Sequence, residues 1–381
     1  MNTFTAPQSA MDLSARIFQG FESHWKEGEG IWRPSYSPEE NEAIIIVTRE
    51  ALALGMTICH DLAGNVYCVL KGSNPDMPVF MTGSHVDAVP NGGRYDGTAG
   101  VVAGLAAVKT LLEENFQPQQ DIVVTIIRSE ESAWFGSALL GSRLACGDVD
   151  KKILKTVRSQ SQETLETHMI RSGLSPAELA YEMQGKHSLI PLEKIGVFIE
   201  VHIEQSPVLV TGQNYNKLGI VTDIRGNTRC PNMIEFFGEA AHSGATPQSM
   251  RRDAVIGAAQ YIVALDSAFL GKANTDVDIV WSIPEIATPN GSSTTVPNFC
   301  TVRPEVRSTD MAVLQWAKEV IQQTAQQMNK FGVRCSSENL QTVVISPPSQ
   351  MTPNIVSHLN RLCQKFNFEA VKLPSGAGHG S

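Results

Sequence analysis

The sequence predicts an α/β protein in which a mainly parallel-sheet domain carries a smaller inserted α+β domain. Three observations lead to this fold class. The chain has 381 residues, and above about 250–300 residues a single core usually splits into domains. Strand-like and helical segments alternate between residues 78 and 131, as in a parallel sheet with crossover helices. After Thr211 the pattern changes to pairs of strands followed by a helix, which indicates a separate α+β unit.

The first domain begins with a helical pattern and continues into the predicted sheet. The segment NEAIIIVTREALALG (residues 41–55) has helical apolar periodicity, and a Gly-rich turn leads into a second apolar helix at residues 101–115. Residues 148–192 are more polar and helical. The strand-like segments of this domain are residues 65–72, 78–89, 121–131 and 195–205.

The second domain follows a segment with the composition of a linker, TGQNYNKLG. Its two predicted helices each carry an apolar stripe with a 3.6-residue period. Its elements include strands at residues 233–240 and 298–307 and helices at residues 249–269 and 309–328. From about Ser346, a helix (354–366) and a strand (369–374) return the chain to the first domain. We therefore assign residues 1–212 and 346–381 to the first domain and residues 213–345 to the inserted one.

The composition narrows the class of function. The chain is 42% hydrophobic and 18% charged, as in ordinary globular proteins. Its net charge of -9, without a basic cluster, argues against a nucleic-acid partner and favours a small-molecule ligand. The seven cysteines are scattered and include no C-x-x-C pair, which is typical of reduced thiols. With no signal-like N-terminus and no run approaching the length of a membrane span, we expect a cytoplasmic protein without membrane contact.

The segment GSHVDAV combines a histidine and an acid at the end of a predicted strand. His85 and Asp87 are two residues apart, so both side chains point to the same face of the strand. A metal-ligating imidazole usually needs its second nitrogen held by a carboxylate or a carbonyl, and Asp87 is placed to do this. The alternative is a surface histidine that happens to lie beside an acid.

Two further acidic positions follow. Asp96 lies in the Gly-rich turn GGRYDGTAG, where an N-terminal helix cap is the alternative role. Glu130 and Glu131 directly follow the strand DIVVTIIRS, and adjacent carboxylates repel each other there. A bound cation would offset this repulsion, with one carboxylate on the metal and the other free as a general base.

The segment VHIEQ repeats the histidine-x-acid arrangement after another predicted strand. It contains His202, with Glu204 on the same face, and then Gln205. The sequence PSGAGHGS near the end of the chain adds His379. Because the candidate ligands lie past predicted strands of the first domain, and open α/β sheets bind ligands at that edge, we expect them to converge.

With these residues assembled, the chain resembles the dinuclear zinc hydrolases related to aminoacylases and bacterial carboxypeptidases. Within them it is most similar to the group of N-carbamoyl-L-amino acid hydrolases and allantoate amidohydrolases. The resemblance runs from about Arg33 to the C-terminus. It rests on the segments GSHVDAVPNGGRYDGTAGV, EESAWFGSALLGSR, VHIEQSPVL, GEAAHSGATPQSMRRDA and PSGAGH, which occur in this order.

The resemblance implies two divalent metal ions per chain. These would be zinc, or manganese, cobalt or nickel, since imidazole and carboxylate ligands accept all four. His85 and His202 would each bind one metal, Asp96 would bridge both, and Glu131 and His379 would complete the two sets of ligands.

The resemblance also assigns catalytic roles. Glu130 would be the general base, taking a proton from the attacking water and passing it to the leaving nitrogen, with Asp87 supporting His85. His242 would donate a hydrogen bond to the oxyanion, in the family usually from the partner subunit. The inserted domain is thereby expected to be a lid and dimerisation domain, and the protein a homodimer.

Substrate contacts follow from the same resemblance. Arg307 would grip the substrate carboxylate, because a guanidinium matches a planar carboxylate, and Gln205 would bind the ureido or amide end. An exposed charge on an edge strand is the alternative for Arg307. Related chains usually have an asparagine where Ser293 or Thr294 stands here.

The sequence departs from its relatives at two other places. Trp134 replaces an arginine of the related chains, which is expected to make a polar contact near the metals apolar. Relatives also continue beyond the position of His379, whereas here two residues follow. Because a ligand so near a terminus tends to fray, we expect weakened occupancy of one metal or a truncated form.

Four functions fit these residues. The first is hydrolysis of N-carbamoyl-L-amino acids to the amino acid, carbon dioxide and ammonia. The second is hydrolysis of allantoate or another ureido acid, which the same arginine and metals would serve. The third is an N-acyl amino acid deacylase or aminopeptidase, and the fourth is a non-catalytic homologue that keeps the fold as a binding protein.

Overall fold

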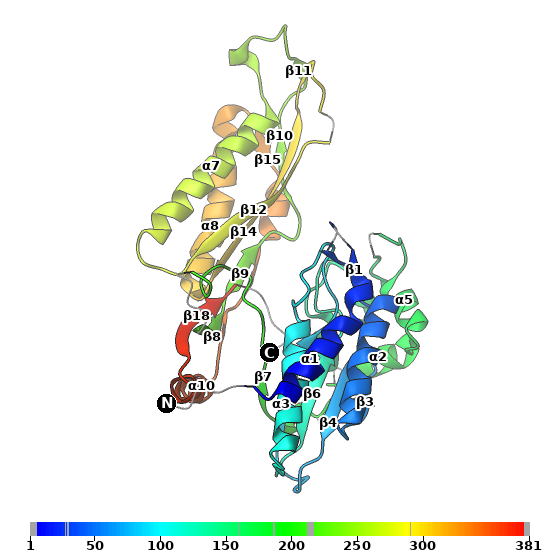
Figure 1. Cartoon of the computed structure of the whole chain (residues 1–381). Helices are drawn as coiled ribbons and strands as arrows, with labels where there is room; N and C mark the ends of the chain where they lie inside the picture. Colours follow the sequence, from blue (N-terminus) through cyan, green and yellow to red (C-terminus); the bar gives the residue numbers. More distant parts are fainter. Residues whose placement is uncertain are drawn as a thin grey trace. The chain divides into compact units, whose positions relative to one another are not determined.

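In a computed structural model, the chain folds into two compact units. The structure describes residues 6–26, 28, 30–158, 160–185, 187–211, 217–289 and 291–376. Among these, the residues up to 211 form unit 1, and residues 217–376 form unit 2 (Figure 1).

Unit 1 is built on a five-stranded sheet. Its strands lie in the order β3 (Thr57–His60), β4 (Val66–Leu70), β6 (Ile122–Ile127), β5 (Val79–His85) and β7 (Ile195–Ile199). β5 pairs in parallel with β6 and β7, whereas β4 pairs antiparallel with β3 and β6. The sheet is therefore mixed, with β4 running opposite to the other four strands. A short turn containing Gly64 joins β3 to β4, and strands joined by so short a turn must run antiparallel.

Three helices of unit 1 build one core with this sheet. They are α1 (Gln8–Gly20), α2 (Pro38–Ala53) and α3 (Thr98–Glu113). α3 packs on β5 and β6, and α1 packs against both α3 and α2 (Figure 1). Leu13, Val47, Leu105 and Val124 are buried in this core. α2 begins earlier than its apolar pattern predicts, because the Ser37 side chain caps the backbone N–H of Glu40.

Shorter elements form a second core of unit 1, in which Trp134 and Phe135 are buried. The helices are α4 (Leu140–Ala145), α5 (Leu165–Arg171) and α6 (Pro176–Glu182). The 3₁₀ helices are η1 (Glu22–His24), η2 (Lys151–Lys155), η3 (Met183–Gly185) and η4 (Leu192–Lys194), and β1 (Trp25–Lys26) pairs with β2 (Gly30–Ile31). Of these elements, η2, α5, α6 and η3 lie within the predicted polar, helical region at residues 148–192.

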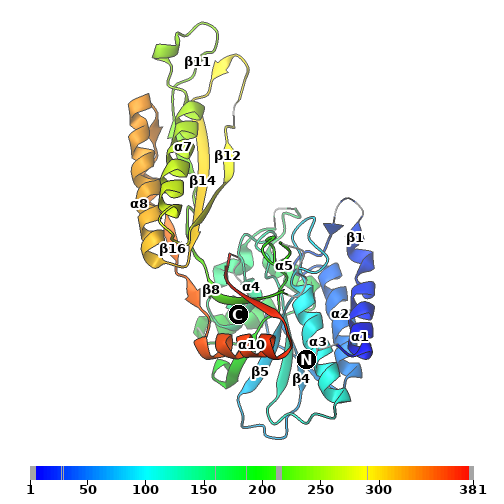
Figure 2. The same cartoon turned by 60° about the vertical axis from the view of Figure 1, so that its left-hand side comes forward.

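Unit 2 contains an antiparallel sheet covered by two long helices. Along the sheet lie β15 (Arg334–Cys335), β10 (Ile234–Phe237), β14 (Phe299–Ser308), β9 (Gly226–Arg229) and β16 (Val344–Ser346), and β12 (Val280–Ala287) pairs with β14. The helices α7 (Ala254–Ala273) and α8 (Met311–Gln327) pack against each other and on β14 (Figure 2). The short elements are β11 (Ala241–His242), β13 (Thr295–Val296), η5 (Gln248–Met250), η6 (Met328–Phe331) and α9 (Ser337–Gln341).

A smaller layer of unit 2 joins its first and last strands. β8 (Lys217–Ile224) pairs in parallel with β18 (Glu369–Ser375) and antiparallel with β17 (Ser349–Gln350), and α10 (Pro353–Lys365) packs on β8 and β18. Residues 346–376 therefore group with unit 2, whereas the sequence assigned them to the first domain. The pairing of β8 with β18 accounts for the difference, because a strand belongs with the partner that satisfies its backbone hydrogen bonds.

The α7 helix corrects one further expectation from the sequence. By length and composition alone, it is apolar enough to cross a membrane. Ala258, Tyr261 and Leu265 on one face are buried in the core of unit 2. Only 33% of the apolar window is buried, and Ile256, Val263 and Leu270 are exposed.

Candidate metal centre

The candidate ligands are carried to one edge of the unit 1 sheet by its parallel strands. β5, β6 and β7 run in the same direction, with His85 opposite Ile127 and Thr82 opposite Ile199. His85 is the last residue of β5, and the other candidates follow β6 or β7 or precede α3. Because the carboxyl ends of parallel strands meet at one edge, these segments lie together as predicted.

Three of the candidates form one potential metal site. One donor atom each from His85, Asp96 and His202 lies within 4.8 Å of the others. His202 Nε2 is 3.3 Å from Asp96 Oδ1, and the two imidazole rings have centroids 6.1 Å apart. Gly97 makes room for this approach, since a Cβ atom there would lie 2.3 Å from His85 Nε2. The backbone of Gly97 also has a positive φ of 63°, which favours glycine.

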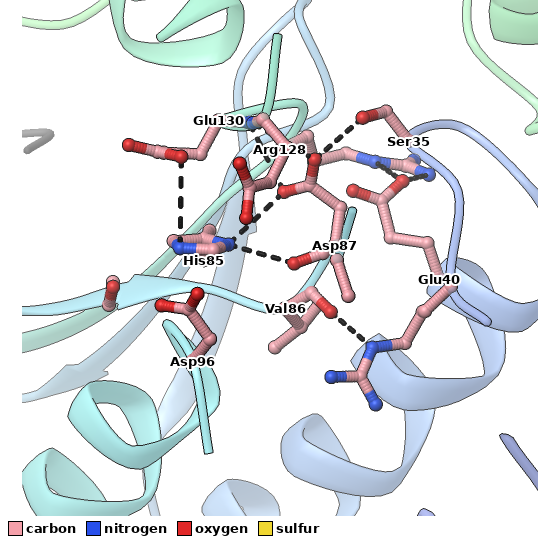
Figure 3. A network of polar contacts seen from close by, with 12 residues as sticks. Ser35, Glu40, His85, Val86, Asp87, Asp96, Arg128 and Glu130 are labelled. Atoms are coloured by element: carbon pink, nitrogen blue, oxygen red, sulfur yellow. Dashed lines mark hydrogen bonds and ion pairs between the residues drawn. The ribbon is translucent and has the colours of Figure 1, made fainter. Parts of the chain in front are cut away.

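A second potential site shares His85 with the two adjacent glutamates. Donor atoms of His85, Glu130 and Glu131 again lie within 4.8 Å of one another. His85 Nε2 is 3.8 Å from Glu130 Oε2 (Figure 3). Because donor atoms of both glutamates lie within 4.8 Å of the His85 donor atom, the geometry does not show which glutamate binds a metal and which acts as a general base.

Asp87 fixes the orientation of the His85 ring. The Nδ1 atom of His85 is 2.9 Å from the backbone oxygen of Asp87 and 3.4 Å from its Oδ1 (Figure 3). A proton on Nδ1 satisfies these acceptors and leaves the lone pair of Nε2 directed at the candidate ligands. His202 is held in the same way, with its Nδ1 2.9 Å from the backbone oxygen of Ile203.

The electrostatics of this cluster favour a cation. Burial raises the pKa of Glu130 to about 8, His85 opposes the shift, and the neighbouring carboxylates of Asp87 and Glu131 add to it. Burial likewise raises the pKa of Glu131 to about 7. The ion pairs of Asp87, Asp96 and Glu130 are all with histidines. Imidazole and carboxylate donors around one point, with excess negative charge, fit divalent metal ions.

Gln205 and Glu204 have different roles although they are adjacent. Gln205 Nε2 donates a hydrogen bond of 2.9 Å to Asp96 Oδ2, which joins this amide to the candidate metal site. The carboxylate of Glu204 instead accepts the backbone N–H groups of Val208 and Leu209. Glu204 therefore stabilises the turn that follows.

Trp134 is a buried packing residue. Its indole is 1% exposed, packs edge-to-face on Trp32, and donates a hydrogen bond of 2.9 Å to the backbone oxygen of Ala88. The residue thus keeps a polar contact to the segment that follows Asp87, where the sequence led us to expect an apolar one.

In unit 2, the structure brings His242 close to the loop that carries Ser293 and Thr294. His242 on β11 is paired with Thr295 on β13, and the Ser243 side chain donates to the backbone oxygen of Ser293. His242 Nδ1 accepts the backbone N–H groups of Gly244 and Ala245, each at 3.1 Å. The proton of a neutral His242 therefore lies on Nε2, which is the donor that an oxyanion requires.

Arg307 lies near the end of β14, beside an acidic neighbour. Its Nη2 atom is 2.9 Å from Glu305 Oε1, and its Nη1 donates to the backbone oxygen of Gly376. A substrate carboxylate would compete with Glu305 for this guanidinium. His379 lies outside the described residues.

The sequence reasoning missed the buried polar side chains around Asp87. Arg33, Ser35 and Glu40 are each 0% exposed, and Arg128 is 3% exposed. The segment RPSYSPEE places several polar residues directly before an apolar helix. Buried polar residues need hydrogen-bond partners, so this segment could have indicated a polar network.

Comparison with known proteins agrees with this arrangement. A family model described as Peptidase family M20/M25/M40 matches residues 81–380. The chain is 29% identical over 355 residues to an N-carbamoyl-L-amino-acid amidohydrolase of a Pseudomonas species, covering 92% of this chain and 82% of the relative. It is 28% identical over 359 residues to the allantoate amidohydrolase of Bacillus subtilis, covering 92% and 81% of the two chains.

A solved structure shares the fold. The crystal structure of a hydantoinase/carbamoylase family amidase from Burkholderia ambifaria superposes with a TM-score of 0.81 at 24% sequence identity. The match covers 100% of this chain and 88% of the other.

Proposed function

The chain belongs to peptidase family M20/M25/M40, and from this premise we propose that it is a metal-dependent amidohydrolase of N-carbamoyl-L-amino acids. It releases the amino acid, carbon dioxide and ammonia. The observation that carries the proposal is the convergence of donor atoms from His85, Asp96 and His202 within 4.8 Å. The name of the Pseudomonas relative supports this choice of substrate.

Two divalent cations per chain fit this set of donors. His85, Asp96, Glu131, His202 and His379 would hold them, as the family resemblance implies. When bound, the cations supply Lewis-acid chemistry, lowering the pKa of a water and polarising the substrate carbonyl. Zinc, manganese, cobalt and nickel all suit these ligands.

The chain's own residues then move the protons. Glu130 takes a proton from the attacking water and delivers it to the leaving nitrogen, which is the role that the family resemblance implies for it. His242 donates its Nε2 proton as a hydrogen bond to the developing oxyanion. Unit 2 acts as the lid domain, and His242 of the partner subunit serves the reacting group.

Substrate recognition uses groups at the two ends of a ureido acid. Gln205 binds the ureido oxygen or nitrogen next to Asp96, and Arg307 pairs with the carboxylate. Ser293 and Thr294 occupy the loop beside His242 and adjust the orientation of the substrate. Allantoate or another ureido acid is the alternative substrate, which the Bacillus subtilis relative supports.

The protein forms a homodimer through its lid domain. Ile256, Val263 and Leu270 lie seven residues apart on α7 and are 50%, 60% and 51% exposed, so they form an apolar stripe along the helix. The long strand β12 pairs with β14 among the described strands and lies at an edge of the sheet. A second copy of this chain would cover both features, and it would also supply His242 across the interface.

The experiment that tests the function is a substrate panel with each metal. The purified protein is loaded with zinc, manganese, cobalt or nickel and assayed on an N-carbamoyl-L-amino acid, allantoate and the matching N-acetyl amino acid. Release of ammonia from the carbamoyl acid, at a rate at least about tenfold above that of acetyl cleavage, is the expected result. Faster cleavage of the acetyl acid would identify a deacylase instead, and binding of these acids without any turnover would identify a non-catalytic homologue.

A further inference from the structure

A buried stretch of the chain at the start of α2 contacts three of the segments that carry candidate site residues, namely the end of β5, the start of α3 and the end of β6. We call residues 33–40 (RPSYSPEE) the anchor segment. Its polar residues Arg33, Ser35 and Glu40 are each 0% exposed. Buried polar groups need partners, and the partners of these three lie on or next to ligand-bearing segments.

Arg33 links the end of β5 to the beginning of α3. Its Nε donates to the backbone oxygen of Val86, the residue between His85 and Asp87. Its Nη2 donates a hydrogen bond of 2.8 Å to the side-chain oxygen of Thr98, two residues after Asp96. One guanidinium thus sets the separation of the two segments that carry His85 and Asp96.

Ser35 donates to the carboxylate that organises the other ligands. Its Oγ is 2.6 Å from Asp87 Oδ2 (Figure 3). The same carboxylate accepts the backbone N–H groups of Glu130 at 3.1 Å and Glu131 at 3.2 Å, and it faces His85 Nδ1. Rotation of Asp87 would therefore disturb the His85 ring and both glutamates at once.

Glu40 fixes the strand end that precedes the glutamates. Its Oε2 accepts two hydrogen bonds from Arg128, one of them 2.9 Å from Nε, in a fully buried ion pair (Figure 3). Ser129, which follows, has a positive φ of 52° and turns the chain toward Glu130. A positive φ is unfavourable for a non-glycine residue and persists only where neighbouring contacts hold the backbone in place. The Glu40–Arg128 ion pair is one of these contacts.

We propose that Ser35 and Glu40 are positioning residues that hold Asp87 and the Glu130–Glu131 turn in the geometry that binds metal. This inference rests on the proposed metal centre and goes beyond its ligands. Groups that orient ligands typically change metal affinity by about 10- to 100-fold when they are removed. Their effect is therefore measurable as binding, independently of catalysis.

The test measures the zinc dissociation constant of the whole protein by competition with a chromophoric chelator. Ser35→Ala removes the hydroxyl on Asp87, and we expect the dissociation constant to rise about 10- to 100-fold. Ser172→Ala is the matched control, because the Ser172 hydroxyl donates to the backbone oxygen of Tyr36 at 3.2 Å, accepts from the Asn41 amide at 3.4 Å, and contacts neither Asp87 nor a candidate ligand. Its dissociation constant stays within about twofold of wild type.

Glu40→Gln is the second variant and is expected to weaken zinc binding in the same direction. If Ser35→Ala does not fold, the zinc dissociation constant of Glu40→Gln tests the proposal instead. The inference is overturned if the folded variants bind zinc like wild type, or if Ser172→Ala weakens binding equally, because the anchor segment then contributes only to stability. Wild-type protein that binds zinc but hydrolyses no ureido acid would refute the proposed function alone, whereas wild-type protein that binds no zinc would refute both.

Discussion

The side-chain amide of Gln205 donates a hydrogen bond of 2.9 Å to Asp96 Oδ2, across 109 positions of the sequence. The same Asp96 carboxylate faces His202, with Oδ1 3.3 Å from Nε2. One carboxylate thus meets a candidate metal ligand on one oxygen and a candidate substrate-binding amide on the other. A ureido group bound by Gln205 would lie next to the proposed cations.

Gln205→Ala is expected to weaken substrate binding more than metal binding. Loss of one hydrogen bond costs about 0.5–1.5 kcal/mol, so KM for the carbamoyl acid rises by up to about tenfold while kcat stays within about threefold. Steady-state kinetics and metal analysis of the same preparation check this. An unchanged KM with reduced metal content would mean that Gln205 serves only to orient Asp96.

Glu130→Gln is expected to abolish turnover while the metal content stays unchanged. The amide cannot accept the proton of the attacking water, so kcat falls by at least about 10²–10⁴-fold. Glu204→Gln is the control, because Glu204 lies between the candidate site residues His202 and Gln205 in the sequence but accepts hydrogen bonds from the backbone of Val208 and Leu209. Turnover by Glu130→Gln at the wild-type rate would exclude this residue as the base.

The metal-free protein is expected to lose stability as the pH rises from about 5 to about 8. The pKa of Glu130 is raised from 4.5 to about 8 in the folded state, mainly by burial. Between these two pKa values the folded state binds more protons than the unfolded state. The free energy of unfolding therefore falls as the pH rises, and the stabilising contribution of Glu130 is lost once the pH exceeds its folded-state pKa.

Thermal unfolding of the metal-free protein at several pH values measures this effect. Added zinc should reverse the loss at high pH, because a cation stabilises the ionised carboxylates. Glu130→Gln should flatten the pH dependence, leaving the smaller contribution of Glu131, whose pKa is raised to about 7. A metal-free wild type whose stability increases from pH 5 to pH 8 would contradict the assignment.

His242→Ala is expected to lower kcat by about 10²–10³-fold, as the loss of one oxyanion donor does in other hydrolases. The metal content is expected to stay at the wild-type level, because His242 is not one of the candidate ligands. Two backbone N–H groups on its Nδ1 atom hold the ring within unit 2. His60→Ala, which removes an exposed histidine at the end of β3, serves as the control. Equal activity of both variants would remove His242 from the mechanism.

Val263→Asp is expected to dissociate the proposed dimer. Val263 is 60% exposed in the middle of the apolar stripe of α7, and an unpaired charge buried there would raise the dimer dissociation constant by at least about 100-fold. Light scattering on a dilution series measures this constant. Ile170→Asp on α5, where the apolar residue is 59% exposed, is the matched control and should leave the oligomeric state unchanged.

Local sequence patterns were sufficient to predict several of the helices and strands and the chemical groups at the strand ends, although helix α1 (Gln8–Gly20) was not predicted. The helices near residues 41–55, 101–115 and 309–328 were readable because apolar periodicity is a local signal. His85 could be chosen as a candidate ligand and Glu130 as a candidate base because His85 ends β5 and Glu130 shortly follows β6. The convergence of these strand ends follows from parallel pairing, a general rule of α/β sheets.

Tertiary structure alone decided the contacts between segments that are distant in sequence. The antiparallel β3–β4 hairpin makes the unit 1 sheet mixed, and the pairing of β8 with β18 groups residues 346–376 with unit 2. Ser35 meets Asp87 across 52 positions and Glu40 meets Arg128 across 88. Local periodicity records which face of an element is apolar, but not which distant polar group will satisfy a buried one, because that choice depends on how the elements pack.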